Sequence, residues 1–219
     1  MKYILAPQNA GALAQYAQTN VLLAFDYDGT LAPIVRDPAK AHMRARTKRA
    51  LGRVALRYPT VVISGRARSD VAARLHAIPL VEILGNHGLE PSPDMARYAA
   101  AVRKWMPVLR HDLRGADGVT IENKKYSIAI HYRQAPLRRD AEREIHRSID
   151  ALCEDCRVVG GKCVLNLLPA GAPHKGEALE RLRREQHAET VIFAGDDVTD
   201  EDVFGLERPG KLLGIRIGR

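Results

Sequence analysis

Two carboxylates lie two residues apart in the segment VLLAFDYDGT. Asp26 and Asp28 follow the apolar run Val21–Phe25, and Gly29 comes directly after them. A short apolar run bounded by a turn signal is typical of a buried strand, most often a parallel one. Ligands bind just outside the carboxyl ends of such strands, and two acids placed there repel each other unless a cation compensates. The spacing favours a Mg²⁺ site, although a surface turn uses the same residue types.

A second group of acids follows another apolar run. The segment Thr190–Ala194 leads through Gly195 into five acids within seven residues, Asp196–Asp202, in a chain whose net charge is +8. Such a cluster belongs either to a bound cation or to a solvated acidic loop. Because a predicted strand leads directly into it, we favour the cation.

Two further polar residues stand where a strand ends or a helix begins. Ser64 ends the apolar run Thr60–Ser64, and Lys175 precedes the predicted helix Glu177–Gln186. A hydroxyl before a glycine turn can donate to a phosphate oxygen, together with nearby backbone N–H groups. Taken alone, Ser64 would be part of an ordinary strand-to-helix connection, in which Ser64 or Ser69 caps the helix, and Lys175 would be a solvated surface lysine. Together with the two acid groups, they indicate a phosphate site.

The elements that position these residues alternate in type. Strands are predicted at Val21–Phe25, Thr60–Ser64, Val81–Leu84, Val191–Ala194 and Lys211–Ile217, with helices at Thr47–Arg57 and Ser69–His76. This order predicts right-handed βαβ units and a parallel sheet.

A module of different pattern interrupts this alternation after about Pro91. Its predicted elements are helices Met95–Asp112 and Leu137–Glu154, antiparallel strands Val119–Glu122 and Tyr126–Tyr132, and a hairpin of Arg157–Gly160 with Lys162–Leu168 that turns at Gly160–Gly161. We therefore predict a catalytic core of residues 1–91 and 172–219 and a cap of residues 92–171. An inserted cap is expected to exclude water and to select the substrate.

The set formed by DxDGT, Ser64, Lys175 and GDDxxD resembles the haloacid dehalogenase (HAD) superfamily of phosphotransferases. The resemblance implies an α/β fold with a Rossmann-like parallel-sheet core and an inserted α+β cap. It implies that Asp26 is the nucleophile, that Asp28 is the general acid and then the base, and that Ser64 and Lys175 bind the phosphoryl oxygens. It also implies a Mg²⁺ ion on Asp26, the backbone carbonyl of Asp28, and Asp196, with Asp197 or Asp200 holding metal-bound waters.

A closer resemblance is carried by GNHGLE, ENKKYSIAIHYR, GGK, PHKG and GDDVTDED, which look like trehalose 6-phosphate phosphatases. It implies a Mg²⁺-dependent phosphoric monoester hydrolase of trehalose biosynthesis, which converts trehalose 6-phosphate to trehalose and phosphate through an aspartyl-phosphate. The implied substrate-binding residues are Gly65, Arg66, Asn86, His87, Glu90, Glu122, Lys124, His131, Arg133, Lys162 and Asn166.

Two positions depart from that family. It usually has Glu and Arg where this chain has Asn166 and Leu168. Asparagine still forms hydrogen bonds, but it loses charge-assisted ones, which are roughly twice as strong. A HAD phosphatase for a different, modified or amino, sugar phosphate is therefore the alternative. A non-catalytic binding protein would have no need of two carboxylates aimed at a phosphate.

The composition of the chain limits the classes of partner that it could bind. Aromatic residues are 5% of the chain, too few for the stacking platforms of single-strand nucleic-acid binders, so the positive charge suits a sugar phosphate and predicts no nucleic acid. No apolar run approaches the roughly 20 residues of a membrane helix, which predicts no membrane partner. Three cysteines and a start unlike a signal peptide predict a cytoplasmic protein. We expect it to be a monomer or a weak homodimer.

Overall fold

The computed structural model describes residues 4–35, 37–152, 156–206 and 210–218. The chain divides into two units, one of Met1–Glu90 with Pro173–Arg219 and one of Pro91–Ala172. We call them the core unit and the cap unit. Among the described residues, no helix has the length and apolar character needed to cross a membrane.

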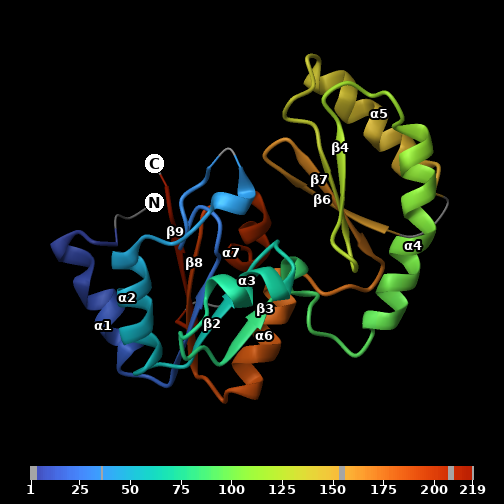
Figure 1. The fold of residues 1–219 in the computed structure, drawn as a ribbon. Coiled ribbons are helices and arrows are strands. Elements are labelled where there is room, and N and C mark those ends of the chain that lie inside the picture. The colour runs from blue at the N-terminus through green and yellow to red at the C-terminus, as the bar shows by residue number, and fades with distance from the viewer. Residues whose placement is uncertain (1–3, 36, 153–155, 207–209, 219) are drawn as a thin grey trace. The chain divides into compact units, whose positions relative to one another are not determined.

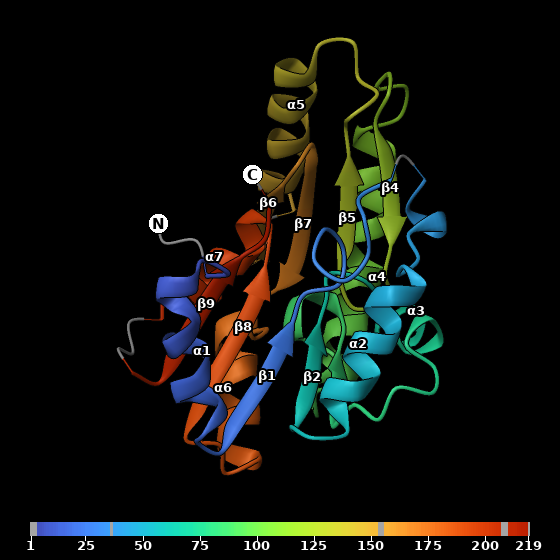
Figure 2. The same ribbon diagram turned by 90° about the vertical axis from the view of Figure 1, so that its left-hand side faces the viewer.

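A five-stranded, wholly parallel sheet forms the centre of the core unit (Figures 1 and 2). Its order is β3 (Glu82–Leu84), β2 (Thr60–Ile63), β1 (Val21–Phe25), β8 (Thr190–Gly195) and β9 (Leu212–Arg216). The strand β1 lies in the middle and is apolar throughout because both faces of the sheet are covered. Its last residue pairs with Ala194, so β1 and β8 end side by side.

Helices cover both faces of this sheet. One face packs against α1 (Ala10–Ala17), α2 (Ala45–Ala55) and α3 (Arg68–Arg74), and the other against α6 (Lys175–Glu185) and α7 (Glu201–Phe204). Successive residues of β1 serve the two faces in turn: Leu22 packs with Leu179 of α6, whereas Leu23 packs with Leu13 of α1. Short 3₁₀ turns lie at Pro7–Asn9, Pro38–Lys40, Asn86–Gly88 and Val198–Asp200.

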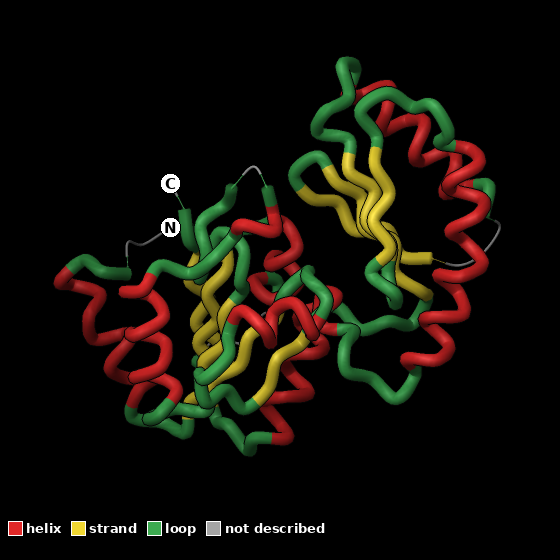
Figure 3. Tube along the Cα trace, viewed as in Figure 1, coloured by secondary structure: helices red, strands yellow, loops and turns green. Residues whose placement is uncertain are grey.

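The cap unit contains a four-stranded antiparallel sheet (Figure 3). Its order is β4 (Thr120–Asn123), β5 (Ile128–His131), β7 (Val164–Pro169) and β6 (Cys156–Gly161). The helices α4 (Met95–Asp112) and α5 (Arg138–Asp150) pack on one face through a core that includes Trp105 and Ile145. Residues that alternate with this core therefore occupy the other face, which we call the open face of the cap sheet.

The predicted fold class, a parallel-sheet α/β core interrupted by an α+β cap, is confirmed. The helix α1 was not predicted. Its sequence, AGALAQYA, has no side-chain cap at Asn9, and it is held instead by packing of Leu13 and Tyr16 against the sheet. Burial that depends on distant strands leaves little local signal.

Two predicted boundaries in the cap are wrong. The second hairpin does not turn at Gly160–Gly161, because both glycines pair in the ladder with β7, and the turn is Lys162–Cys163 with Cys163 at φ +62°. Glycine permits a turn without requiring one. The predicted helix Leu137–Glu154 begins later and ends at Asp150, and its last two predicted residues lie outside the described part of the chain.

Candidate active site

The carboxyl ends of β1 and β8 bring the two predicted acid groups together. The backbone N–H of Asp26 donates to the carbonyl of Ala194 at 2.9 Å, which extends the parallel ladder one residue beyond β1. The two strands therefore deliver Asp26 and Asp196 to the same edge of the sheet. Carboxylate oxygens of Asp26, Asp196 and Asp200 all lie within 4.8 Å of one another.

A buried lysine joins two of these acids. The Nζ atom of Lys175, at the start of α6, donates to Oδ1 of Asp26 and to Oδ1 of Asp200, both at 2.7 Å. All three side chains are buried. Buried charges are costly unless they are paired and hydrogen-bonded, so this arrangement ties the ends of β1, β8 and α6 to one another.

The cluster carries more negative than positive charge. When all three carboxylates are ionised, they and the ammonium group of Lys175 leave two negative charges. Burial raises the pKa of Asp26, the attraction of Lys175 lowers it, and the repulsion of Asp200 raises it again, to about 7. Burial and Asp200 likewise raise the pKa of Asp196. Oxygen ligands with two uncompensated charges fit a hard divalent cation.

Gly29 allows the two acidic loops to meet. Its φ is +93°, and a Cβ at this position would overlap the carboxylate of Asp196. Next to it, Oγ1 of Thr30 donates to Oδ1 of Asp196 at 3.3 Å. The glycine of DxDGT is therefore required both by its backbone conformation and by the space that Asp196 occupies.

The acidic residues of the loop after β8 form different hydrogen bonds. Oδ2 of Asp200 accepts from the backbone N–H groups of Asp196 and Asp197, at 2.9 and 3.0 Å. The Asp197 carboxylate accepts from the N–H of Val198 at 2.8 Å and caps the following 3₁₀ turn. The group of three carboxylates thus contains Asp200, whereas Asp197 caps a turn, although the family resemblance implied that either of them could hold metal-bound waters. The three-residue spacing of Asp197 and Asp200 is that of a capping box, and it was the feature of the sequence from which the cap could have been predicted.

Ser64 lies at the end of β2, next to β1. It is buried, and its Oγ accepts from the N–H of Arg66 at 3.2 Å. A Cβ on Gly65 would overlap the ring of His87, so this glycine permits the close approach of the GNHG loop. The side chain of Arg66, a predicted substrate ligand, is bonded to Asp28.

The GNHGLE segment forms a loop with strong internal bonds. Asn86 and His87 have φ of +49° and +60° and are buried. Oε2 of Glu90 accepts from Nδ2 of Asn86 at 3.0 Å and from the backbone N–H of Arg68 at 2.8 Å. The contacts of Asn86 and Glu90 therefore anchor the loop to the start of α3, and a role in substrate binding stays a prediction for these residues.

Three of the predicted sugar-binding residues share the open face of the cap sheet. These residues are Glu122, His131 and Asn166. Glu122 of β4 and Asn166 of β7 are both paired in register with Ala129 of β5, which lies between them. His131 lies two residues along β5 and its Nε2 is 2.9 Å from Oε2 of Glu122. Nδ2 of Asn166 donates to the carbonyl of Val159 at 3.3 Å.

The remaining three cap residues lie at the ends of strands. The backbone N–H of Lys124 donates to the carbonyl of Ser127 at 3.0 Å, in the turn between β4 and β5. Arg133 follows β5, and its Nη2 donates to the carbonyl of Lys162 in the β6–β7 turn at 3.1 Å. These contacts place Arg133 and Lys162 at the same end of the sheet.

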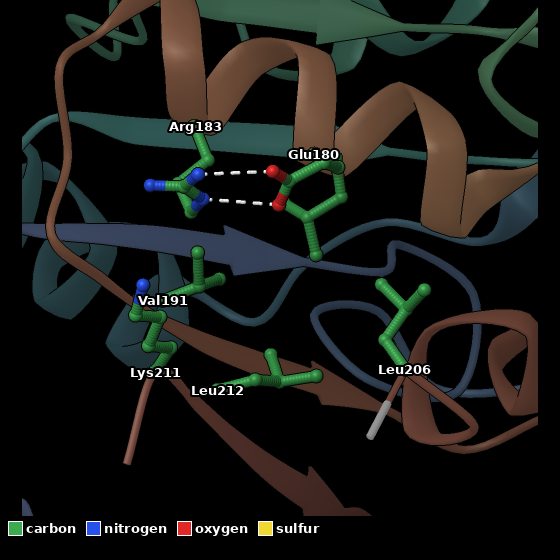
Figure 4. A pocket seen from close by; sticks show the side chains of 7 residues that line it. Glu180, Arg183, Val191, Leu206, Lys211 and Leu212 are labelled. Carbon is green, nitrogen blue, oxygen red and sulfur yellow. Dashed lines mark hydrogen bonds and ion pairs between the residues drawn. The ribbon is translucent and has the colours of Figure 1, made fainter. Parts of the chain in front are cut away.

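A small pocket elsewhere in the core unit lies among α6, β8 and β9 (Figure 4). Its walls are mostly apolar and include the ion pair between Glu180 and Arg183. None of the predicted site residues is among the residues that line it.

Residues 24–217 match the trehalose-phosphatase family model. The chain belongs to the trehalose-phosphatase family. It is 37% identical over 213 residues to a trehalose-phosphate phosphatase of Mycobacterium avium, and 31% identical over 237 residues to trehalose 6-phosphate phosphatase RA3 of Zea mays. These alignments cover 88% and 94% of this chain, but 53% and 65% of the relatives. The chain thus spans about half to two thirds of the length of these relatives.

A solved structure agrees with this assignment. The C-terminal domain of the trehalose-6-phosphate phosphatase of C. albicans superposes with a TM-score of 0.77 at 26% identity, covering 90% of this chain and 77% of that one. Membership of the trehalose-phosphatase family was predicted from the motifs and is confirmed.

The imidazole of His174 caps α6, the helix that begins with Lys175. This cap was not predicted from the sequence. Nδ1 of His174 accepts from the N–H groups of Gly176 and Glu177, at 3.1 and 3.3 Å, and Oε2 of Glu177 accepts from the N–H of His174 at 3.1 Å. This is a capping box with histidine in place of the usual Ser, Thr, Asp or Asn. Because Lys175 is the next residue, the cap also sets the direction from which its side chain reaches the acids.

We expect His174→Ala to lower the free energy of unfolding by about 1 kcal/mol, because the first turn of α6 loses its acceptor. His174→Asn should recover most of the loss, since asparagine is among the preferred caps. Urea unfolding of the two variants and the wild type measures this. Equal stability of His174→Ala and the wild type would show that the cap contributes nothing.

Proposed function

We propose that this chain hydrolyses trehalose 6-phosphate to trehalose and phosphate, with the core unit performing the phosphoryl transfer and the cap unit binding the sugar. The observation that carries the proposal is the buried Asp26–Lys175–Asp200 cluster with Asp196 beside it, in a chain of the trehalose-phosphatase family. Relatives with that activity match most of this chain.

In the proposed reaction, Asp26 is the nucleophile. Lys175 donates to Oδ1, which leaves Oδ2 to attack phosphorus in line with the departing sugar oxygen. The bond from Oδ2 to phosphorus forms while the bond to the sugar oxygen breaks, and Asp28 gives its proton to that oxygen. The Asp28 carboxylate then takes a proton from water, whose oxygen displaces Asp26 and releases phosphate.

Ser64 and Lys175 serve the transferring phosphoryl group. An ammonium group has three N–H donors, of which Asp26 and Asp200 take two. The third donor and the Ser64 hydroxyl are proposed to bond phosphoryl oxygens as their charge shifts in the transition state.

A Mg²⁺ ion fits the acid cluster. Asp26, Asp196 and the backbone carbonyl of Asp28 would hold it. Asp200 accepts hydrogen bonds at both oxygens and would orient the loop that carries Asp196. When bound, the ion would neutralise the charge between nucleophile and phosphoryl group.

The open face of the cap sheet is proposed to bind the disaccharide. Glu122, His131 and Asn166 offer a carboxylate, an imidazole and an amide in adjacent positions, which suits hydroxyl groups. Lys124, Arg133 and Lys162 add positive charge at the ends of the strands.

A second candidate substrate follows from Asn166. This central position of the open face carries a neutral amide that already bonds a strand carbonyl, where the resemblance predicts a glutamate. The same chemistry on a modified or amino sugar phosphate is therefore the alternative function.

We expect Asp26→Asn to lower kcat for trehalose 6-phosphate by more than about a hundredfold, over 2.7 kcal/mol of transition-state stabilisation, because an amide is a poor nucleophile. Asp28→Asn should lose as much on this substrate but less on p-nitrophenyl phosphate, whose leaving group needs no proton. Phosphate release measures both. Asp202→Asn, the same change at an exposed acid of α7, is the matched control. A residual activity of Asp26→Asn within tenfold of the wild type excludes the covalent role.

Mg²⁺ should raise the midpoint of thermal unfolding of the wild type. A ligand at 100 times its Kd stabilises by about 2.7 kcal/mol, which is on the order of 5 °C or more for a chain of this size. Asp196→Asn should lose most of this shift, whereas Asp202→Asn should keep it. EDTA should remove phosphatase activity. Full activity after exhaustive chelation contradicts a metal requirement.

Asn166→Glu separates the two substrates. If trehalose 6-phosphate is the substrate, the new carboxylate should raise kcat/KM several-fold, about 1 kcal/mol for a charge-assisted bond in place of a neutral one. If another sugar phosphate is preferred, the variant should lower kcat/KM for that compound. Asn123→Glu, which adds the same charge in β4 at the position next to Glu122, is the control. A panel of sugar phosphates tested with the wild type identifies the comparison substrate, and failure on every member contradicts the proposed function.

A further inference from the structure

Arg66 binds the carboxylate of Asp28 through two hydrogen bonds. Nε donates to Oδ2 at 2.6 Å and Nη2 donates to Oδ1 at 2.7 Å. This is a side-on, bidentate pair of the kind that fixes the plane of a carboxylate as well as its position. The Arg66 side chain is 13% exposed and that of Asp28 38% exposed, so the carboxylate is the accessible member of the pair.

Arg66 is itself held from three further directions. Its Nη1 donates to Oδ2 of Asp70 at 2.8 Å, and its Nη2 also donates to the carbonyl of Pro38 at 2.8 Å. Its guanidinium carbon lies 5.7 Å from the centre of the Tyr27 ring. With these contacts, the guanidinium cannot turn toward another ligand without breaking several bonds.

The chain of contacts continues to α3. Oδ1 of Asp70 accepts from Nε of Arg74 at 2.9 Å. The other two nitrogens of Arg74 donate to the carbonyls of Ala41 and Ala39, at 2.8 and 3.2 Å. Charges alternate along Asp28, Arg66, Asp70 and Arg74, and the backbone of the segment 38–41 is bonded to both arginines.

An isolated ion pair at a surface contributes little to stability, because two long side chains lose their freedom to form it. Here four partly buried side chains are ordered in series, and the series ends at the one residue to which the proposed function gives a proton-transfer role. Each carboxylate oxygen has two acceptor sites. Arg66 therefore occupies one site on each oxygen of Asp28 and leaves the other for a proton.

We infer that Arg66 is a positioning residue, which orients the Asp28 carboxylate toward the sugar oxygen, and that Asp70 holds Arg66 in place. The inference rests on the proposed function, in which Asp28 transfers the proton. It replaces direct substrate binding by Arg66, which the motif resemblance implied, with an indirect role.

The two roles differ in which kinetic constant they change. A residue that binds the substrate changes KM, or changes turnover of every phosphate ester alike. A residue that orients the proton donor changes kcat, and only for an ester whose leaving group needs a proton.

The test uses Arg66→Gln, Arg66→Lys and Asp70→Asn of the full chain, on trehalose 6-phosphate and on p-nitrophenyl phosphate. We expect Arg66→Gln to lower kcat for the sugar phosphate at least about tenfold, with KM within about twofold, and to change kcat for the aryl phosphate less than about threefold. Arg66→Lys should behave like Arg66→Gln, because an ammonium group cannot form the bidentate pair. Asp70→Asn should show a smaller loss with the same substrate selectivity.

A double-mutant cycle with Asp28→Asn shows whether Arg66 acts through Asp28. If it does, adding Arg66→Gln to Asp28→Asn should lower kcat for trehalose 6-phosphate less than about twofold further. Glu180→Gln is the matched control, because Arg183 binds Glu180 by two hydrogen bonds of 3.0 and 2.9 Å (Figure 4). This pair belongs to the same unit, and neither residue is a member of the acid cluster. This control variant should have the kcat and KM of the wild type on both substrates.

Equal losses on both substrates, a change confined to KM, or additive losses in the double mutant would each overturn the positioning role. Thermal unfolding of every variant identifies losses due to misfolding, and Asp70→Asn keeps the test decisive if Arg66→Gln does not fold, because it leaves Arg66 itself in place. The proposed function fails separately, if the wild type turns over p-nitrophenyl phosphate but no sugar phosphate.

Discussion

The ammonium group of Lys175, buried between Asp26 and Asp200, is the interaction on which the core unit depends. Its Nζ lies 2.7 Å from a carboxylate oxygen of each acid, and Lys175 is 149 positions from Asp26 and 25 positions from Asp200 in the sequence. Removing one partner of a buried ion pair costs about 3–5 kcal/mol, because a charge is left uncompensated. The ends of β1 and β8 and the start of α6 must therefore meet at one point, and the topology of the sheet, with β1 beside β8, makes that possible.

Three glycines border this dense group of charges at positions where a side chain would not fit. A Cβ on Gly29 would overlap the carboxylate of Asp196, and one on Gly195 would overlap that of Asp200. Gly176, next to Lys175, has the backbone carbonyl of Asp202 in the space of a Cβ. The acids approach one another closely because these three positions lack side chains. The remaining excess of negative charge is what a divalent cation would balance.

The two units divide the chemistry by the periodicity of their strands. In the core, β1, β2 and β8 are buried and are apolar except for a threonine at the start of β2 and of β8, and the charged residues come after the strands end. In the cap, alternate residues of each strand face α4 and α5, so polar residues such as Glu122 and Asn166 occupy the open face within the strands. The first arrangement suits the fixed reaction centre that we propose for the core, and the second suits the broad sugar-binding surface that we propose for the cap.

The sequence by itself determined the family, the strands β1, β2 and β8, and the edge at which the acids and Ser64 lie. Apolar runs that end in polar residues define such strands, and the carboxyl ends of parallel strands meet at one edge. Only the tertiary structure decided that Asp200 joins the carboxylate group while Asp197 caps a turn, and that Arg66 binds Asp28. It also decided that α1 is a helix and that the hairpin turns at Lys162–Cys163. The roles of Asp200 and Arg66 depend on which of several chemically similar side chains come close to a partner that is distant in the sequence, and residue type and spacing do not contain that distance. The helix α1 and the hairpin turn depend on packing and strand register against elements elsewhere in the chain.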